Sequence, residues 1–404
     1  MWEEVTHVVE DKKETQFFID WVNLAALTPK YKQQAEDLFL QVANRVPELA
    51  TCRTTPQSAP WHVEGPTVSD GIIRMLATIF AIVDGAGLLH IEEFVRHKDL
   101  EHEIRELEET IRERAATLQA YACVHDIAKA STASFSAPAG SKGEQEGFSK
   151  HRYRLSDEAT EKEKALYLKL LKAFHSSHQD LSVPELMAAF YDQYEISVHY
   201  LGHAKKGAGA DFFEARENVA DFFRLPEDDR VLLTFMTRYH MDVLDFFTKG
   251  TNEQKFELMT SRANKAGLDG DDALDAMLAA TFLDSTVGSL AYKDGTFFIK
   301  TEAIFNWLYS EQRAIPLRRA RRIEEANRRE KKKLMQILEK SALSPEEVFT
   351  MLNVTFGPER GQVMEEIYAL VRDRGRKIDF GDKTPLIAGR IGEARKLFDQ
   401  KGSS

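Results

Sequence analysis

The sequence predicts an all-α fold. Apolar residues recur at three- and four-residue steps along most of the 404-residue chain, which is the spacing of one face of an α-helix. Gly and Pro interrupt helices most often, and the chain contains only 22 and 12 of them. We therefore expect helices throughout and little or no sheet. A chain of this length is also expected to form two or three domains rather than one.

The first elements follow from the apolar pattern. Residues 1–55 are expected to form an N-terminal helical segment of two helices, which ends where the two prolines of residues 54–60 break the pattern. An apolar helix should run from Val68 to Val83. A single long helix is expected over residues 100–130, with a charged, solvated first half and a second half that enters a core.

The remaining chain is expected to be helical apart from one loop. Residues 131–150 are rich in Ser, Ala and Gly with little apolar content, so they predict a flexible surface loop. Helices should resume at about Asp157. We expect residues 56–295 to form the main domain, with a helical insertion near residues 86–118, and residues 296–404 to form a basic helical C-terminal domain.

Composition predicts a soluble cytoplasmic protein. Its two cysteines, Cys52 and Cys123, show no pairing pattern, which favours a reducing compartment. No apolar run approaches the roughly 18 residues that span a bilayer, and no basic-then-apolar leader opens the chain, so we expect no membrane association. The net charge is -11, but the segment from Arg313 to Lys333 holds ten Lys/Arg and three Glu, a local +7, which leaves -18 elsewhere.

The strongest local motif is the run from Tyr121 to Lys129. It places His125 and Asp126 side by side at the end of an apolar stretch, with Lys129 about one helical turn later. An imidazole and a carboxylate form an intermediate donor set, which suits Mn, Ni, Co, Fe, Zn or Mg. The lysine is near enough to neutralise a phosphate held by such an ion.

Ten short segments occur in a fixed order along roughly four-fifths of the chain. They are residues 55–57, 61–65, 75–76, 125–129, 201–204, 207–208, 223–226, 238–241, 282–285 and 352–361. This ordered series resembles the HD domain and tail of CCA-adding tRNA nucleotidyltransferases, and its order is more specific than any one segment. No glycine-rich nucleotidyltransferase segment with paired aspartates precedes the series, so we expect no polymerising head.

The resemblance implies an HD-domain helical bundle and a role for each matching residue. His125 and Asp126 would be metal ligands, and Asp284 would complete the site from a late helix. His203 and His240 would line the site or hold a second ion. Together with Lys129 they would stabilise charge or protonate the leaving group.

One ligand position departs from the family pattern. The first histidine of the family lies six residues after the Glu of the Trp-His-x-Glu segment, and this chain has Asp70 there. Asp70 can ligate a hard cation. Alternatively, His90 or His97 fills the position, or no further ligand exists.

Ordinary roles compete with these assignments. His62 could pack or cap, His203 could bind a backbone carbonyl, His240 could be a satisfied core histidine, and Asp284 could be a helix N-cap. The basic run could be a solvated helix face or could contact RNA phosphates. Its four central cations, called the tail arginines below, are Arg318, Arg319, Arg321 and Arg322.

The sequence therefore predicts a metal-dependent phosphohydrolase or phosphodiesterase. The resemblance implies a nucleotide or a tRNA-like RNA end as the substrate, such as a 2',3'-cyclic phosphate. A second hypothesis is a catalytically weakened HD-fold protein that binds RNA or acts as a scaffold, which the Asp70 substitution motivates. A third is a free-nucleotide phosphohydrolase, which would not need the basic tail.

Overall fold

A computed structural model describes residues 29–88, 97–154, 156–248 and 253–309. The chain divides into two compact units, Met1–Arg313 and Ala314–Ser404, and every described residue belongs to the first. The described part is mostly helical with two small two-stranded sheets, so the predicted all-α class is confirmed.

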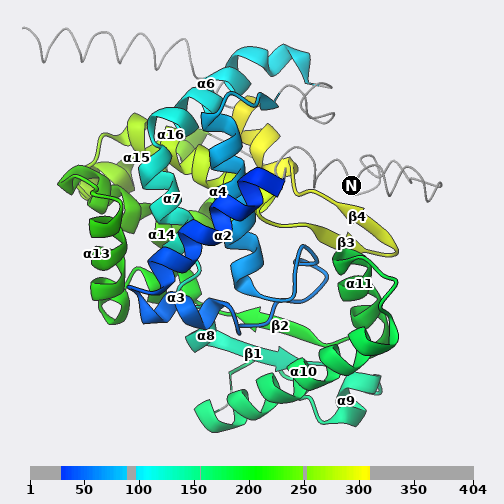
Figure 1. Ribbon diagram of the computed structural model, residues 1–404. Coiled ribbons are helices and arrows are strands. Elements are labelled where there is room, and N and C mark those ends of the chain that lie inside the picture. Colours follow the sequence, from blue (N-terminus) through cyan, green and yellow to red (C-terminus); the bar gives the residue numbers. More distant parts are fainter. Residues whose placement is uncertain (1–28, 89–96, 155, 249–252, 310–404) are drawn as a thin grey trace, which may run out of the picture. The chain divides into compact units, whose positions relative to one another are not determined.

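A helical bundle contains the main core (Figure 1). Helix α2 packs on α4 in this core, so residues 29–52 of the predicted N-terminal segment are part of the bundle. The bundle consists of α2 (Pro29–Ala43), α3 (Pro47–Cys52), α4 (Val68–Val83), η2 (Lys98–Leu100), α6 (Glu101–Glu113), α7 (Ala115–Val124), α8 (Lys129–Thr132), α12 (His203–Gly207), η3 (Ala210–Phe212), α13 (Phe213–Phe222), α14 (Glu227–Thr248), α15 (Glu253–Lys265), α16 (Gly270–Thr281) and η4 (Phe282–Val287).

Helix α4 has the limits that the sequence predicts. At its start, Thr67 N and Oγ1 both donate to Asp70 Oδ2 at 2.8 Å in a capping box. Ile72, Met75 and Ile79 then fall on one buried face. Both signals are local, which is why the sequence alone locates this helix.

The helix expected over residues 100–130 is broken in the structure into α6 and α7, followed by a turn and the start of α8 at Lys129. It breaks at Arg114, whose backbone leaves helical geometry with φ -107° and ψ 23°. The Arg114 guanidinium forms ion pairs with Asp229 of α14 (3.4 Å) and with Asp272 of α16. These long-range contacts accompany the break. Within the helical insertion predicted near residues 86–118, α6 buries its apolar face against α4 and α16, and residues 89–96 lie outside the described part of the chain.

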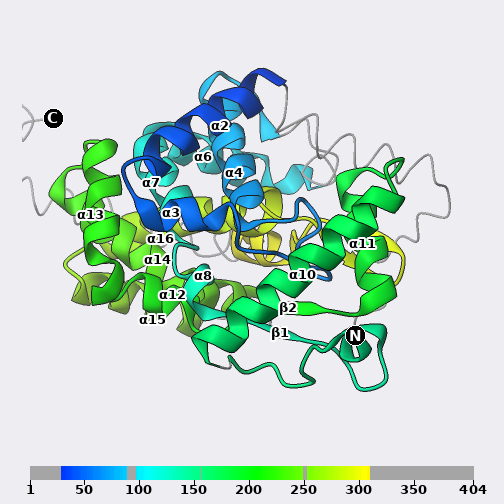
Figure 2. The same cartoon turned by 60° about the horizontal axis from the view of Figure 1, so that its bottom comes forward.

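A small lobe packs beside the bundle, and in Figure 2 helix α10 lies across its two strands. The strands are antiparallel, with Ala133 opposite Tyr200 and Ser136 opposite Ser197. The small lobe consists of β1 (Ala133–Ser136), α9 (Lys142–Glu146), α10 (Asp157–Ser177), α11 (Val183–Tyr194) and β2 (Ser197–Tyr200).

The small lobe corrects the prediction of a flexible loop at residues 131–150. Phe135 and Phe148 from this segment are buried together, with ring centroids 6.1 Å apart, and Phe135 also contacts Tyr167 of α10. These two aromatic residues are enough to form a small core, although the segment as a whole has a low apolar content. The pairing partner of β1 lies about sixty residues later, beyond the reach of local pattern.

A hairpin of β3 (Ala291–Lys293) and β4 (Thr296–Phe298) turns at Asp294–Gly295. Residues 302–309 are helical, and Ile304 and Trp307 lie in the main core. This part of the expected C-terminal domain therefore packs within the first unit. None of the helices among the described residues combines the length and apolar character that crossing a bilayer requires.

Candidate metal centre

The His125–Asp126 pair lies in a tight turn between two helices. His125 ends α7, and the chain turns through backbone bonds from Ile127 N to Val124 O (3.1 Å) and from Lys129 N to Asp126 O (2.9 Å). These bonds span three residues instead of four, as in a 3₁₀ turn. The pair is therefore at a helix end and not on the flank of one long helix.

Three other elements supply the remaining side chains. His203 begins α12 directly after Gly202, whose φ of 78° lies in the left-handed region that favours glycine. His240 comes from α14. Asp284 lies within η4, a π-helical stretch that continues α16, so it is not a helix N-cap. Short π-helical segments occur frequently at functional sites.

The three histidines share one hydrogen-bond arrangement. Each Nδ1 lies within hydrogen-bond distance of a backbone carbonyl three residues earlier, so Nδ1 carries a proton and Nε2 is left to face the centre. The three bonds join His125 to Ala122 (3.0 Å), His203 to Tyr200 (2.7 Å) and His240 to Thr237 (2.9 Å).

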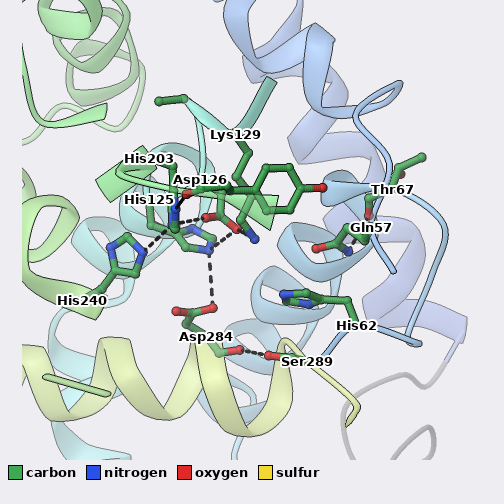
Figure 3. A network of polar contacts seen from close by, with 12 residues as sticks. Gln57, His62, Thr67, His125, Asp126, Lys129, His203, His240, Asp284 and Ser289 are labelled. Carbon is green, nitrogen blue, oxygen red and sulfur yellow. Dashed lines mark hydrogen bonds and ion pairs between the residues drawn. The ribbon is translucent and has the colours of Figure 1, made fainter. Parts of the chain in front are cut away.

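These Nε2 atoms converge on two carboxylates (Figure 3). His203 Nε2 is 3.1 Å from His240 Nε2 and 3.2 Å from Asp126 Oδ1. His125 Nε2 is 3.1 Å from Asp126 Oδ2 and 3.6 Å from Asp284 Oδ1. The ligand atoms of Asp126, His203 and His240 all lie within 4.8 Å of one another, and these three residues are buried.

A shared cation would satisfy this geometry. With Nδ1 protonated, a neutral histidine presents a lone pair at Nε2. His203 Nε2, His240 Nε2 and the Asp126 carboxylate would then be three acceptors in contact with no hydrogen between them. A metal ion bound by all three removes this repulsion. The group of Asp126, His203 and His240 could therefore hold a metal ion, and its mixed nitrogen and oxygen donors fit a divalent cation.

Electrostatics keep His240 neutral at pH 7, which leaves its Nε2 lone pair available to a metal ion. Burial, together with the charge that His203 carries when it is protonated, lowers the pKa of His240 to about 3. Burial alone would also lower the pKa of His125, but Asp126 and Asp284 raise it to about 10. Burial would raise the pKa of either carboxyl, yet neighbouring charges, chiefly that of His125, hold both well below their usual range. The centre thus favours positive charge at neutral pH.

Lys129 completes the cluster. Its ammonium is 2.7 Å from Asp126 Oδ2 and 4.9 Å from the centroid of the Tyr200 ring. Burial alone would lower the pKa of Lys129, but Asp126 raises it, so the ammonium stays charged. A permanent cation therefore stands beside the group that could hold the metal.

The structure brings together six predicted site residues, namely His125, Asp126, Lys129, His203, His240 and Asp284. It does not place Asp70 in the metal-holding group, because that carboxylate is committed to Thr67 in the capping box of α4. His97 stacks on Phe305 and its Nδ1 is 2.9 Å from Tyr309 Oη. His90 and the tail arginines lie outside the described residues.

Two further groups lie beside these side chains, and the sequence assigns neither of them a role in metal binding. Tyr121 is buried with its ring centroid 5.1 Å from that of His125, and among the described residues its hydroxyl has no hydrogen-bond partner. His62, for which the sequence allows a packing role, places Nδ1 2.9 Å from Glu64 Oε1. Glu64 is buried and also accepts from Leu290 N at 2.9 Å. In the sequence, Tyr121 looks like any aromatic residue of a core. Its place beside the centre depends on tertiary structure.

Comparisons of the chain with protein-family models, with curated proteins and with solved structures found no match.

Proposed function

We propose that the protein is a metal-dependent phosphohydrolase that cleaves a phosphate ester of a nucleotide or of an RNA end. The observation that carries the proposal is the contact between three acceptor atoms, on Asp126, His203 and His240, beside the buried ammonium of Lys129. A bound cation and a fixed ammonium together suit a phosphoryl group, which gains negative charge as it reacts. The resemblance of the ordered segments to an HD domain supports the same reaction class.

The donor atoms limit which metal ions the group would bind. Two imidazole nitrogens and a carboxylate oxygen favour Mn, Fe, Co, Ni or Zn, and they do not exclude Mg. Such an ion would supply Lewis-acid chemistry by polarising the phosphoryl group and making water a better nucleophile. His125 and Asp284 lie against this group and would extend the donor set or hold a second ion.

The positions of the side chains suggest a different role for each residue. His203 and His240 face each other through Nε2, which suits ligands better than proton donors. Lys129 keeps its proton and would bind a nonbridging phosphoryl oxygen, because its ammonium is buried where charge interactions are strong. Asp126 holds Lys129 in place and offers its other oxygen to the metal group.

The partners and compartment belong to the same proposal. The tail arginines, which lie outside the described residues, would hold RNA through its phosphates. Cys52 and Cys123 are both buried and free, and burial raises the pKa of Cys52 to about 12. Two unreactive thiols that remain unpaired fit a reducing cytoplasm.

One observation favours a second candidate, a scaffold or RNA-binding protein that keeps the fold without turnover. Asp70 stands where the resembled family has a histidine ligand, and its carboxylate caps α4. A centre lacking that ligand could bind metal weakly and hydrolyse slowly.

Hydrolysis of bis-p-nitrophenyl phosphate and of a 2',3'-cyclic nucleotide, with Mn, Ni or Co added, separates the two candidates. Turnover should be lost in Asp126→Ala and kept in His175→Ala, a matched change at an exposed histidine on α10. The scaffold role is favoured if no combination of metal and ester gives turnover that depends on Asp126.

A further inference from the structure

A second lysine lies close to the candidate centre. Lys300 follows β4, and its carbonyl accepts a hydrogen bond from Thr286 Oγ1 at 3.2 Å, which ties it to η4, the element of Asp284. Burial lowers the pKa of Lys300, while Glu64, Asp284 and Asp126 act on it in the opposite direction. The ammonium is therefore within electrostatic reach of the carboxylates of the centre.

Lys300 differs from Lys129 in having no acidic partner. Lys129 is paired with Asp126 at 2.7 Å, whereas Lys300 forms no ion pair with any Asp or Glu in the part of the chain that the structure describes. A partly buried ammonium without a counter-charge costs free energy. An anion that binds at the centre would find this cation available.

An exposed tryptophan stands beside the same ammonium. Lys300 Nζ lies 5.4 Å from the centroid of the Trp61 ring, and Trp61 is 58% exposed. The backbone on either side is fixed, because Tyr292 N donates to Pro60 O at 2.8 Å and His62 N donates to a carbonyl of the same loop at 3.1 Å. An exposed aromatic side chain on an anchored loop offers a stacking surface to a planar ligand.

We propose that Lys300 and Trp61 form a nucleotide-recognition site at the centre, in which the ammonium binds a phosphate oxygen and the base stacks on the exposed face of the indole. This inference rests on the proposed function and names the two parts of the substrate that the protein would recognise, a phosphate and a base. Lys300 recognises the phosphate of any ester. Trp61 distinguishes nucleotides from phosphosugars, because only a base has a π-face to stack.

Calorimetric binding tests this without turnover. The full-length protein with Mn²⁺ is titrated with adenosine monophosphate and with ribose 5-phosphate. Lys300→Met should weaken both ligands about tenfold or more, the effect of losing a hydrogen bond to a charged group. Trp61→Leu should weaken the nucleotide about fivefold or more and leave ribose 5-phosphate unchanged. Lys293→Met, at an exposed lysine on β3, is the matched control and should bind both ligands as the wild type does.

Each alternative result overturns the proposal. Equal effects of Trp61→Leu on both ligands, no effect of Lys300→Met, or no binding of the nucleotide to the wild type at millimolar concentration would each do so. Lys300→Arg should restore binding, which separates loss of charge from misfolding. Failure of the proposed function is recognised independently, because nucleotide binding that depends on Trp61 without any Asp126-dependent turnover leaves this inference standing and removes the hydrolase.

Discussion

The ion pair between Lys129 and Asp126 allows a quantitative test of the charge balance at the centre. The paired atoms are 2.7 Å apart, and the side chains are 6% and 8% exposed. Removing Asp126 leaves the Lys129 ammonium as an uncompensated buried charge, which costs about 3–5 kcal/mol. Asp126→Asn should therefore lower the free energy of unfolding by about 3 kcal/mol or more. Lys129→Met should cost less, because Asp126 keeps His125 as a charged partner at 3.1 Å.

The double variant should lose much less than the sum of the two single changes, since it removes charges of both signs together. We expect a coupling free energy of about 2–3 kcal/mol. The pair of Lys162 and Glu158 on α10 is the matched control, because its atoms are also 2.7 Å apart but the side chains are 75% and 80% exposed. Its coupling should be about 0.5 kcal/mol or less.

Urea unfolding at neutral pH measures both cycles. A chelator is added so that bound metal does not contribute, and the dependence on urea must stay the same among the variants for the free energies to be compared. A coupling at Lys129–Asp126 no larger than that of the control pair would refute the argument that these charges are buried and mutually dependent.

Three further predictions concern titration, a buried hydroxyl and the tail. With chelator present, His125 has a pKa of about 10 in the folded protein and about 6.5 in the unfolded chain. The stability that protonated His125 contributes is therefore complete below about pH 6.5 and is lost as pH rises through 10. Urea midpoints should thus fall between about pH 8 and 10 more in the wild type than in His125→Gln, and equal slopes would contradict this. Tyr121→Phe removes a buried hydroxyl that has no acceptor among the described residues, so the free energy of unfolding should stay equal or rise by up to about 1–3 kcal/mol, and a clear loss would count against it. Replacing the tail arginines by Gln should flatten the log–log salt dependence of tRNA binding by about 0.7–0.9 per lost contact, and an unchanged slope would leave them as a solvated helix face.

Local signals account for the parts of the fold that the sequence predicts correctly. The capping box of Thr67 and Asp70 and the apolar face after it are both contained within α4. The features that differ from prediction depend on distant partners. Strand β1 needs β2, about sixty residues later, and the break at Arg114 coincides with ion pairs to α14 and α16. Short-range periodicity contains neither contact.

The candidate centre shows the same division. His125 and Asp126 are adjacent, so a short motif predicts them, and the order of the later segments indicates His203, His240 and Asp284. Asp70 shows the limit of motif spacing, because the same residue is also a good capping residue at the third position of a helix, and the structure uses it so. The spacing of a motif does not show whether such a carboxylate is a metal ligand or a helix cap.

The remaining members of the centre depend on tertiary burial. Tyr121 becomes notable because its hydroxyl is enclosed, and Lys300 because it lies near the centre without an acidic partner among the described residues. A tyrosine in an apolar helix and a lysine after a hairpin are ordinary in any sequence. Their environment is created by α14, η4 and the loop of Trp61, which no local pattern brings together.

The central claim is that Asp126, His203 and His240 hold a divalent metal ion. Elemental analysis of the purified protein, followed by calorimetric titration of the chelated protein with Mn or Ni, tests it most directly. We predict at least one ion per chain in the wild type and in His175→Ala, and a loss of about tenfold or more in affinity in His203→Ala and Asp126→Ala, because each removes one of three ligands. Equal and negligible metal in the wild type and in these variants would contradict the account.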